Sequence, residues 1–241
     1  MLGNIPRPQS HVTLSTTTGP LRVKHPVCAT LVHELQSQGH IVTVVLPNQQ
    51  RSWIGKAHFV EDVIGLHHYH PYQQEGKPIP IDLVVSGPNL GANATALFSL
   101  FSGTIGGAME AVLCGKRSIA LSFEPATKDD ICNQGQITDA SRHAVRLIEH
   151  LYHSWDDGVE LYSVNIPLRS VPSGDRKVVT RNADSPLLLR WAPDLSDIHG
   201  SMDRTSDADD DWAVREGKTS VAPLKANFMH AAQCEGEIHL G

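Results

Sequence analysis

Residues 81–123 constrain the fold more than any other part of the chain. Residues 82–86 are apolar and β-branched, which is typical of a strand covered on both faces. A Gly/Asn-rich polar loop follows, then a helical pattern over 104–114 and a second strand pattern over 118–122. This order of strand, helix and strand predicts two parallel strands of an α/β sheet.

The loop after the first of these strands carries side chains suited to binding a ligand. They are Asn89, Asn93, Ser99, Ser102 and Thr104. Open α/β sheets bind ligands at the carboxyl ends of their strands. Amide and hydroxyl oxygens at that position predict an oxygen-rich site for a phosphate group or a hard metal ion.

The same alternation extends through the rest of the chain. Residues 11–46 predict a strand over 11–15, a helix over 26–38 that stops at Gly39, and a strand over 41–46. A loop over 47–58 contains Ser52. The other predicted elements are a polar connection over 66–80, a helix over 137–153, and strands over 160–165, 177–180 and 218–223.

These elements predict one domain over 1–241 with a three-layer, Rossmann-like α/β fold. Its sheet is mostly parallel, with helices on both faces, and the core covers 11–172. After residue 172 the periodicity fades, so 173–241 is predicted as a C-terminal β-arm with an acidic loop over 203–211. Because this tail has little apolar mass and exposed strand edges seek partners, it predicts self-association.

Composition excludes several classes of protein. A net charge of −6 with no basic block argues against a nucleic-acid-binding surface, and 5% aromatic residues argue against base-stacking platforms. No apolar run approaches the roughly 20 residues of a membrane span. Residues 1–10 show no apolar core of a signal peptide. The scattered cysteines Cys28, Cys114, Cys132 and Cys234 indicate reduced thiols, and we expect a cytoplasmic protein.

Several motifs in the chain carry a resemblance to one family. They are SGPNLGAN (86–93), SGTIGGAMEA (102–111), SIALSF (118–123), VVLPNQQRSWIGKAH (44–58), LYSVNIP (161–167) and DWAVREGKTSVAPL (211–224). In this order they resemble the SurE family of metal-dependent nucleotidases and phosphatases, or survival proteins. The wording is most similar to the fungal and plant branch, often labelled acid phosphatase.

The resemblance implies a set of site residues. SurE proteins bind one divalent cation, Mg²⁺ or Mn²⁺, through two aspartates after the first strand, a serine and an asparagine. Ser52 and Asn89 match the serine and the asparagine, and Asn93 matches a second asparagine, so Asn89 and Asn93 are the implied catalytic residues. The family's phosphate-binding Ser-Gly-Thr matches Ser102, Gly103 and Thr104. Such a helix start suits phosphate, and the metal would activate a water molecule.

The chain departs from the family pattern at two places. Thr17 and Thr18 stand where the family has its two aspartates, with Gly19-Pro20 fixing the register. Only neutral oxygens would then face the cation, so metal binding is weakened or lost. Residues 59–80 are also too few for the family's usual strands and loop. Divergence, an altered exon structure or a faulty gene model would each explain both departures.

Simpler roles compete with some of these assignments. The polar side chains of the 89–104 loop could cap helices and turns. His67, His68 and His70 lack the spacing of a metal cluster, and the acidic run 209–211 is expected to be a solvated loop. Cys114 ends an apolar helix and is expected to be a core residue.

The resemblance implies hydrolysis of phosphate monoesters, such as nucleoside 5′-monophosphates, by metal-activated water. Two alternatives stay open. One is a catalytically impaired paralogue or truncated gene product, and the other is a metal-independent module that binds phosphate or nucleotide. In the family the C-terminal arm is exchanged between subunits, which implies a homodimer or tetramer here. No nucleic-acid or membrane partner is expected.

Overall fold

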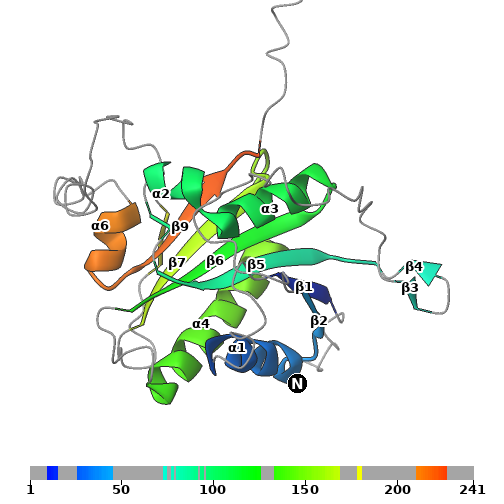
Figure 1. The fold of residues 1–241 in the computed structure, drawn as a ribbon, viewed down its shortest axis with the longest axis horizontal. Helices are drawn as coiled ribbons and strands as arrows, with labels where there is room; N and C mark the ends of the chain where they lie inside the picture. Colours follow the sequence, from blue (N-terminus) through cyan, green and yellow to red (C-terminus); the bar gives the residue numbers. More distant parts are fainter. Residues whose placement is uncertain are drawn as a thin grey trace, which may run out of the picture.

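The protein is built around a central twisted sheet (Figure 1). The computed structural model describes residues 10–15, 26–45, 73–74, 77–78, 80–91, 93–94, 96–125, 133–168, 178–180 and 210–226. Within these residues, seven strands form one sheet with the order β2-β1-β5-β6-β7-β9-β8. The strands are β1 (His11–Ser15), β2 (Ile41–Val45), β5 (Leu83–Leu90), β6 (Arg117–Pro125), β7 (Leu161–Leu168), β8 (Val178–Thr180) and β9 (Thr219–Leu224). The short strands β3 (Gln73–Gln74) and β4 (Lys77–Pro78) form a separate antiparallel pair within the predicted connection.

The sheet is mostly parallel, as the sequence predicts. Strands β2, β1, β5, β6 and β7 pair in parallel, whereas β9 runs antiparallel to β7 and β8 runs parallel to β9. The chain passes outward from β1 to β2 and then returns to the other side of β1 as β5. This reversal makes the carboxyl ends of β1 and β5 the topological switch point, where open α/β sheets bind their ligands.

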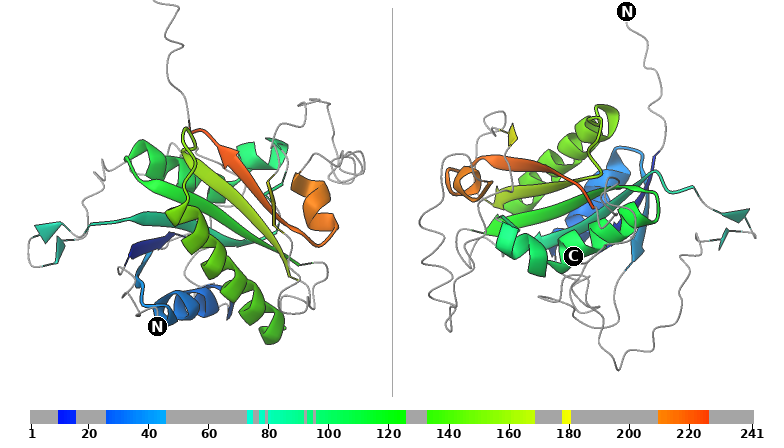
Figure 2. Two further views of the ribbon diagram at one scale, coloured as in Figure 1. Left: turned by 180° about the vertical axis from the view of Figure 1, so that it is seen from behind. Right: turned by 90° about the horizontal axis from the view of Figure 1, so that it is seen from above.

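Helices cover both faces of the sheet, which confirms the predicted three layers (Figure 2). Helices α1 (Pro26–Ser37) and α4 (Gln134–His153) pack together on one face. Helices α2 (Ala96–Phe101) and α3 (Gly103–Leu113) lie on the opposite face. The short helix α6 (Asp210–Arg215) contacts β7 and β9. In the described part of the chain, no helix combines the length and the apolar character needed to cross a membrane.

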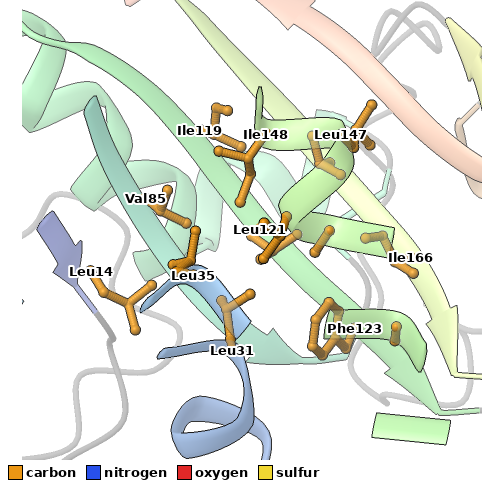
Figure 3. Packing of buried hydrophobic residues seen from close by; sticks show 14 of the residues in the cluster. Leu14, Leu31, Leu35, Val85, Ile119, Leu121, Phe123, Leu147, Ile148 and Ile166 are labelled. Atoms are coloured by element: carbon orange, nitrogen blue, oxygen red, sulfur yellow. The ribbon is translucent and has the colours of Figure 1, made fainter. Parts of the chain in front are cut away.

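The two faces differ in polarity. The face under α1 and α4 holds the larger apolar cluster, in which Leu31 and Leu35 of α1 and Ile148 of α4 pack against the strands (Figure 3). The smaller cluster under α3 comprises Ile105, Ala108, Ala120, Leu161 and Ala226. Toward the carboxyl ends of the strands, the α3 face also carries the buried polar side chains of Ser122, Asn165 and Ser220. A buried polar region of this kind needs hydrogen-bond partners within the protein.

The structure corrects two predictions around the polar loop. β5 continues to Leu90, so Asn89 lies in a strand rather than in the loop. The extension forms because β6 is long enough for Ser122 to pair with Asn89 after a shift of register that follows Ser86. The predicted loop also contains α2, so Ser99 is helical.

The C-terminal segment contributes to the main sheet. β9 lies between β7 and β8, so residues 219–224 of the predicted arm pack with the core. The wider division into 11–172 and 173–241 stays a prediction. The solvated loop expected over 209–211 is wrong for Asp210 and Asp211, which are 1% and 3% exposed at the start of α6. Asp211 pairs with Arg215 at 2.9 Å, and a helix start favours acidic side chains.

Candidate functional site

The candidate site lies at the carboxyl edge of the parallel strands. β1 ends at Ser15, which pairs with Ser86 of β5, and β5 continues beyond this point to Leu90. The predicted ligand positions Thr17, Thr18 and Ser52 lie outside the described residues. Their metal-binding roles, and the expected closeness of Ser52 to Asn89, therefore stay predictions.

Asn89 is held by a local turn at the end of β5. Its Nδ2 donates a hydrogen bond to the carbonyl oxygen of Gly91 at 2.9 Å. The backbone N–H of Gly91 in turn donates to the carbonyl oxygen of Phe123 at 2.9 Å, which ties the turn to β6. The amide nitrogen of Asn89 is thus engaged, while its oxygen is the side-chain atom that could ligate a cation.

Asn93 is an anchor of the loop. Its side chain is only 6% exposed, and its Nδ2 donates to Ser122 Oγ at 2.7 Å. Its backbone N–H donates to Asn165 Oδ1 at 3.0 Å. These contacts fix the loop to β6 and β7, whereas the catalytic role predicted for Asn93 stays a prediction.

Ser102 caps the start of α3. Its backbone is extended, with φ −71° and ψ 117°, and its Oγ accepts a hydrogen bond from the backbone N–H of Ile105 at 3.1 Å. The simpler capping role is therefore present. The first turn of a helix also has N–H groups without intrahelical acceptors, here including those of Gly103 and Thr104. Because the Thr104 side chain is buried, a phosphate at this point would meet backbone groups rather than the Thr104 hydroxyl.

Close packing brings this helix start to the same edge as Asn89. A Cβ atom built on Gly107 of α3 would lie 2.8 Å from Ser86 Oγ and 3.7 Å from Ser86 Cβ, so α3 packs closely on β5 here. α3 therefore begins over the carboxyl end of β5. The polar residues Asn89, Asn93 and Ser102 accordingly belong to one region of the molecule.

The described residues do not by themselves fit a tightly bound dication. No group of three or more His, Cys, Asp or Glu side chains suited to a metal occurs among them. Asn89 offers a neutral oxygen. Glu124 carries one carboxylate, two residues after Ser122 in β6. Affinity for hard cations depends on the number of carboxylate ligands, so the donor set favours weak binding.

Sequence reasoning missed a buried polar network beneath the loop. Ser122 and Asn165 accept hydrogen bonds from Asn93, and Asn165 Nδ2 donates to Ser220 Oγ of β9 at 3.3 Å. The available signal was a polar residue near the carboxyl end of an otherwise apolar strand. Ser122 occupies such a place in SIALSF, and Asn165 does so in LYSVNIP.

A doubly wound sheet with a polar edge at its switch point defines a ligand-binding α/β protein of the Rossmann type. The family model described as "Survival protein SurE" matches residues 23–80 and 62–186. The chain belongs to the SurE family. This confirms the resemblance inferred from the sequence motifs.

Curated relatives differ in how much of their length the chain spans. The chain is 37% identical over 173 residues to the "5'-nucleotidase SurE" of Ruegeria pomeroyi, covering 63% of each. It is 31% identical over 245 residues to that of Synechococcus elongatus, covering 83% of this chain and 89% of the relative. It is also 31% identical over 197 residues to the "Probable tubulin--tyrosine ligase PBY1" of Saccharomyces cerevisiae, covering 67% of this chain but 26% of that protein.

A solved structure supports the fold. The SurE protein from Aquifex aeolicus superposes with a TM-score of 0.66 at 22% sequence identity, covering 92% of this chain and 96% of that one. At this identity the likeness concerns the fold alone. It agrees with the three-layer α/β architecture described above.

Proposed function

We propose that this chain is a SurE-type phosphohydrolase that acts on phosphate monoesters such as nucleoside 5′-monophosphates. The observation that carries the proposal is the capped start of α3, held over the carboxyl end of β5 near Asn89. Relatives named 5′-nucleotidase support the substrate class. A helix start with N–H groups on offer and a positive dipole end suits a phosphate dianion.

Each part of the proposed site has a distinct task. The backbone N–H groups of Gly103 and Thr104 would bind the phosphate oxygens, with Ser102 holding the helix start in place. The oxygen of Asn89 would face a divalent cation, together with Ser52. When bound, Mg²⁺ or Mn²⁺ would lower the pKa of a coordinated water and neutralise phosphate charge.

The missing aspartates set the expected activity. Thr17 and Thr18 remove two negative charges from the position of the family's cation ligands. We therefore expect weak metal binding and slow hydrolysis by the chain as it stands. This makes a catalytically impaired paralogue part of the proposal.

A second candidate is a metal-independent module that binds phosphate or nucleotide. The same helix start favours it, because backbone N–H groups bind an anion without help from a cation. Under this alternative, a chelator leaves the affinity for adenosine 5′-monophosphate (AMP) unchanged and no hydrolysis accompanies binding.

Restoring the two carboxylates tests the proposal. Calorimetry with Mn²⁺ should show tighter binding for the double substitution Thr17→Asp and Thr18→Asp, and AMP hydrolysis should increase. The matched control is Gln36→Asp with Gln38→Asp, which adds the same charge at the end of α1 leading into β2, at the opposite edge of the sheet. The control should change neither Mn²⁺ binding nor AMP hydrolysis.

The possible results distinguish the phosphohydrolase from the metal-independent binding module. Fast, EDTA-sensitive turnover by the unmodified chain would show that other ligands replace the aspartates. AMP binding without hydrolysis in every variant would favour the binding module. No AMP binding by any variant would overturn both.

Two further statements remain proposals. Self-association into a homodimer or tetramer through 173–241 rests on the strand-like tail and on the family resemblance. A cytoplasmic location rests on the scattered cysteines, of which Cys28 and Cys114 are free thiols in the described part of the chain. Cys28 is buried, whereas Cys114 is exposed, so the core position expected for Cys114 is wrong.

A further inference from the structure

A buried line of polar side chains runs beneath the loop that follows β5. Asn165, in the middle of this line, is 0% exposed. Its Oδ1 accepts the backbone N–H of Asn93 at 3.0 Å, and its Nδ2 donates to Ser220 Oγ at 3.3 Å. One amide side chain thus joins the loop to β7 and to β9.

We propose that Asn165 is a positioning residue, which sets the geometry of the ligand site by fixing the loop between Asn89 and Ser102. The inference rests on the proposed function, because the site that it positions is the one proposed there. Asn165 does not itself contact the substrate in this proposal. It acts through the backbone of Asn93.

The chemistry explains why an asparagine is suited to this position. The Asn93 N–H needs an acceptor and the Ser220 hydroxyl takes a donated hydrogen, and an amide supplies both from one side chain. An apolar residue at position 165 would leave the backbone N–H of the buried Asn93 without a hydrogen-bond acceptor, which is destabilising. The loop would have to move for this N–H to find another acceptor. The second anchor, from Asn93 Nδ2 to Ser122 Oγ at 2.7 Å, would then hold the loop alone.

The line also links the site to the C-terminal part of the chain. Ser220 belongs to β9, which pairs with β7 at Asn165. Docking of β9 therefore orders the Asn165 amide, and through it the loop. Weakening this link should loosen the loop without removing any residue that meets the ligand.

Amide hydrogen exchange tests the link independently of ligand binding. In the intact chain, the Asn93 N–H should exchange slowly because it is bonded to a buried oxygen. Asn165→Leu, which keeps the branched shape of the side chain but has no hydrogen-bonding atom, should speed its exchange. The matched control is Ser163→Ala, which removes a buried hydroxyl two residues earlier in β7 and should leave Asn93 protected.

AMP binding tests the consequence for the site. The titration is made with folded protein in EDTA and repeated with added Mn²⁺. We expect Asn165→Leu to bind AMP about tenfold more weakly, since about 1.4 kcal/mol of lost positioning is a factor of ten. Ser163→Ala should bind as the unmodified chain does. A purely structural role would lower stability but leave the affinity of the folded protein unchanged.

Each outcome decides the question. Faster exchange together with weaker binding supports the proposal. Unchanged exchange at Asn93, or unchanged AMP affinity, overturns it. Failure of the unmodified chain to bind AMP overturns the positioning role, whereas the proposed function is overturned only if the variant with Thr17→Asp and Thr18→Asp does not bind AMP either. If Asn165→Leu does not fold, Asn165→Ala removes the same hydrogen-bonding atoms without adding bulk, and the same two measurements are made on it.

Discussion

Gly87 of β5 lies against the backbone of Leu121 in β6 beside the candidate site, and we expect it to tolerate no side chain. Its φ is +135°, a conformation that residues with a Cβ atom rarely adopt. A Cβ built there would overlap the carbonyl oxygen of Leu121 and lie 3.1 Å from its carbonyl carbon. These are backbone atoms of a central strand, so they cannot rotate away as a side chain would.

Two costs determine the expected effect of Gly87→Ala. The backbone conformation alone costs an alanine roughly 1–3 kcal/mol. Relieving the overlap requires β5 and β6 to separate, which weakens hydrogen bonds in the middle of the sheet. Together we expect a loss of about 4 kcal/mol in the free energy of unfolding, a large part of the roughly 5–15 kcal/mol typical of a domain.

Gly115→Ala is the matched control. Gly115 also has a positive φ, +73°, but a Cβ built on it meets nothing within 4 Å. Its substitution should therefore cost only the backbone conformation, about 1–2 kcal/mol. The difference between the two variants isolates the overlap between Gly87 and Leu121.

Urea unfolding followed by circular dichroism measures both losses from the shift of the midpoint at constant m-value. We expect Gly87→Ala to lose about 2–3 kcal/mol more than Gly115→Ala. Equal losses in the two variants would refute the argument. They would mean that β6 can yield at Leu121 without cost, or that β5 approaches it less closely.

Three further outcomes are expected. Ser102→Ala and Asn133→Ala remove the caps of α3 and α4, and each should lower the free energy of unfolding in urea by about 1 kcal/mol. Only Ser102→Ala should weaken AMP binding. Equal AMP affinity in the two variants would show that Ser102 is not part of the binding site. Burial raises the pKa of Tyr162 above its ordinary value of 10.0; the backbone N–H of Asp156 opposes this, and the hydrogen bond from the Tyr162 hydroxyl to the Asp156 carboxylate adds to it. The stability that the neutral phenol contributes is therefore present below pH 10 and lost as the pH rises through the higher folded-state pKa. Tyr162→Phe should therefore flatten the alkaline fall in stability, and an unchanged fall would assign it to other groups. Light scattering of the intact chain should give the mass of a dimer or tetramer if 173–241 mediates association, whereas a monomer mass would contradict that role.

Much of the fold could be predicted because its signals are local. The strands β1, β2, β6 and β7 are short apolar runs, and α1 and α4 show apolar residues at helical spacing. The helix predicted over 137–153 is α4, which begins earlier, at Gln134. Its polar first turn carries no apolar periodicity, and it is set by Asn133, whose Oδ1 accepts from the backbone N–H of Gln136 at 3.2 Å.

The candidate site was predictable in part. The positions of Asn89, Asn93 and Ser102 near strand ends and a helix start followed from the strand–loop–helix order. The sequence did not reveal what each side chain does there. Ser102 caps α3 and Asn93 is buried, and both facts depend on packing against other strands.

The sequence by itself determined the α/β class, the mostly parallel sheet and the polar edge, because side-chain periodicity reports burial within windows of a few residues. Only the tertiary structure decided that β5 continues to Leu90, that β9 joins the sheet, and that Asn165 holds the loop. The partners of Asn165 lie 72 residues before it, at Asn93, and 55 residues after it, at Ser220. Contacts over such separations form when the chain folds, and no local pattern records them.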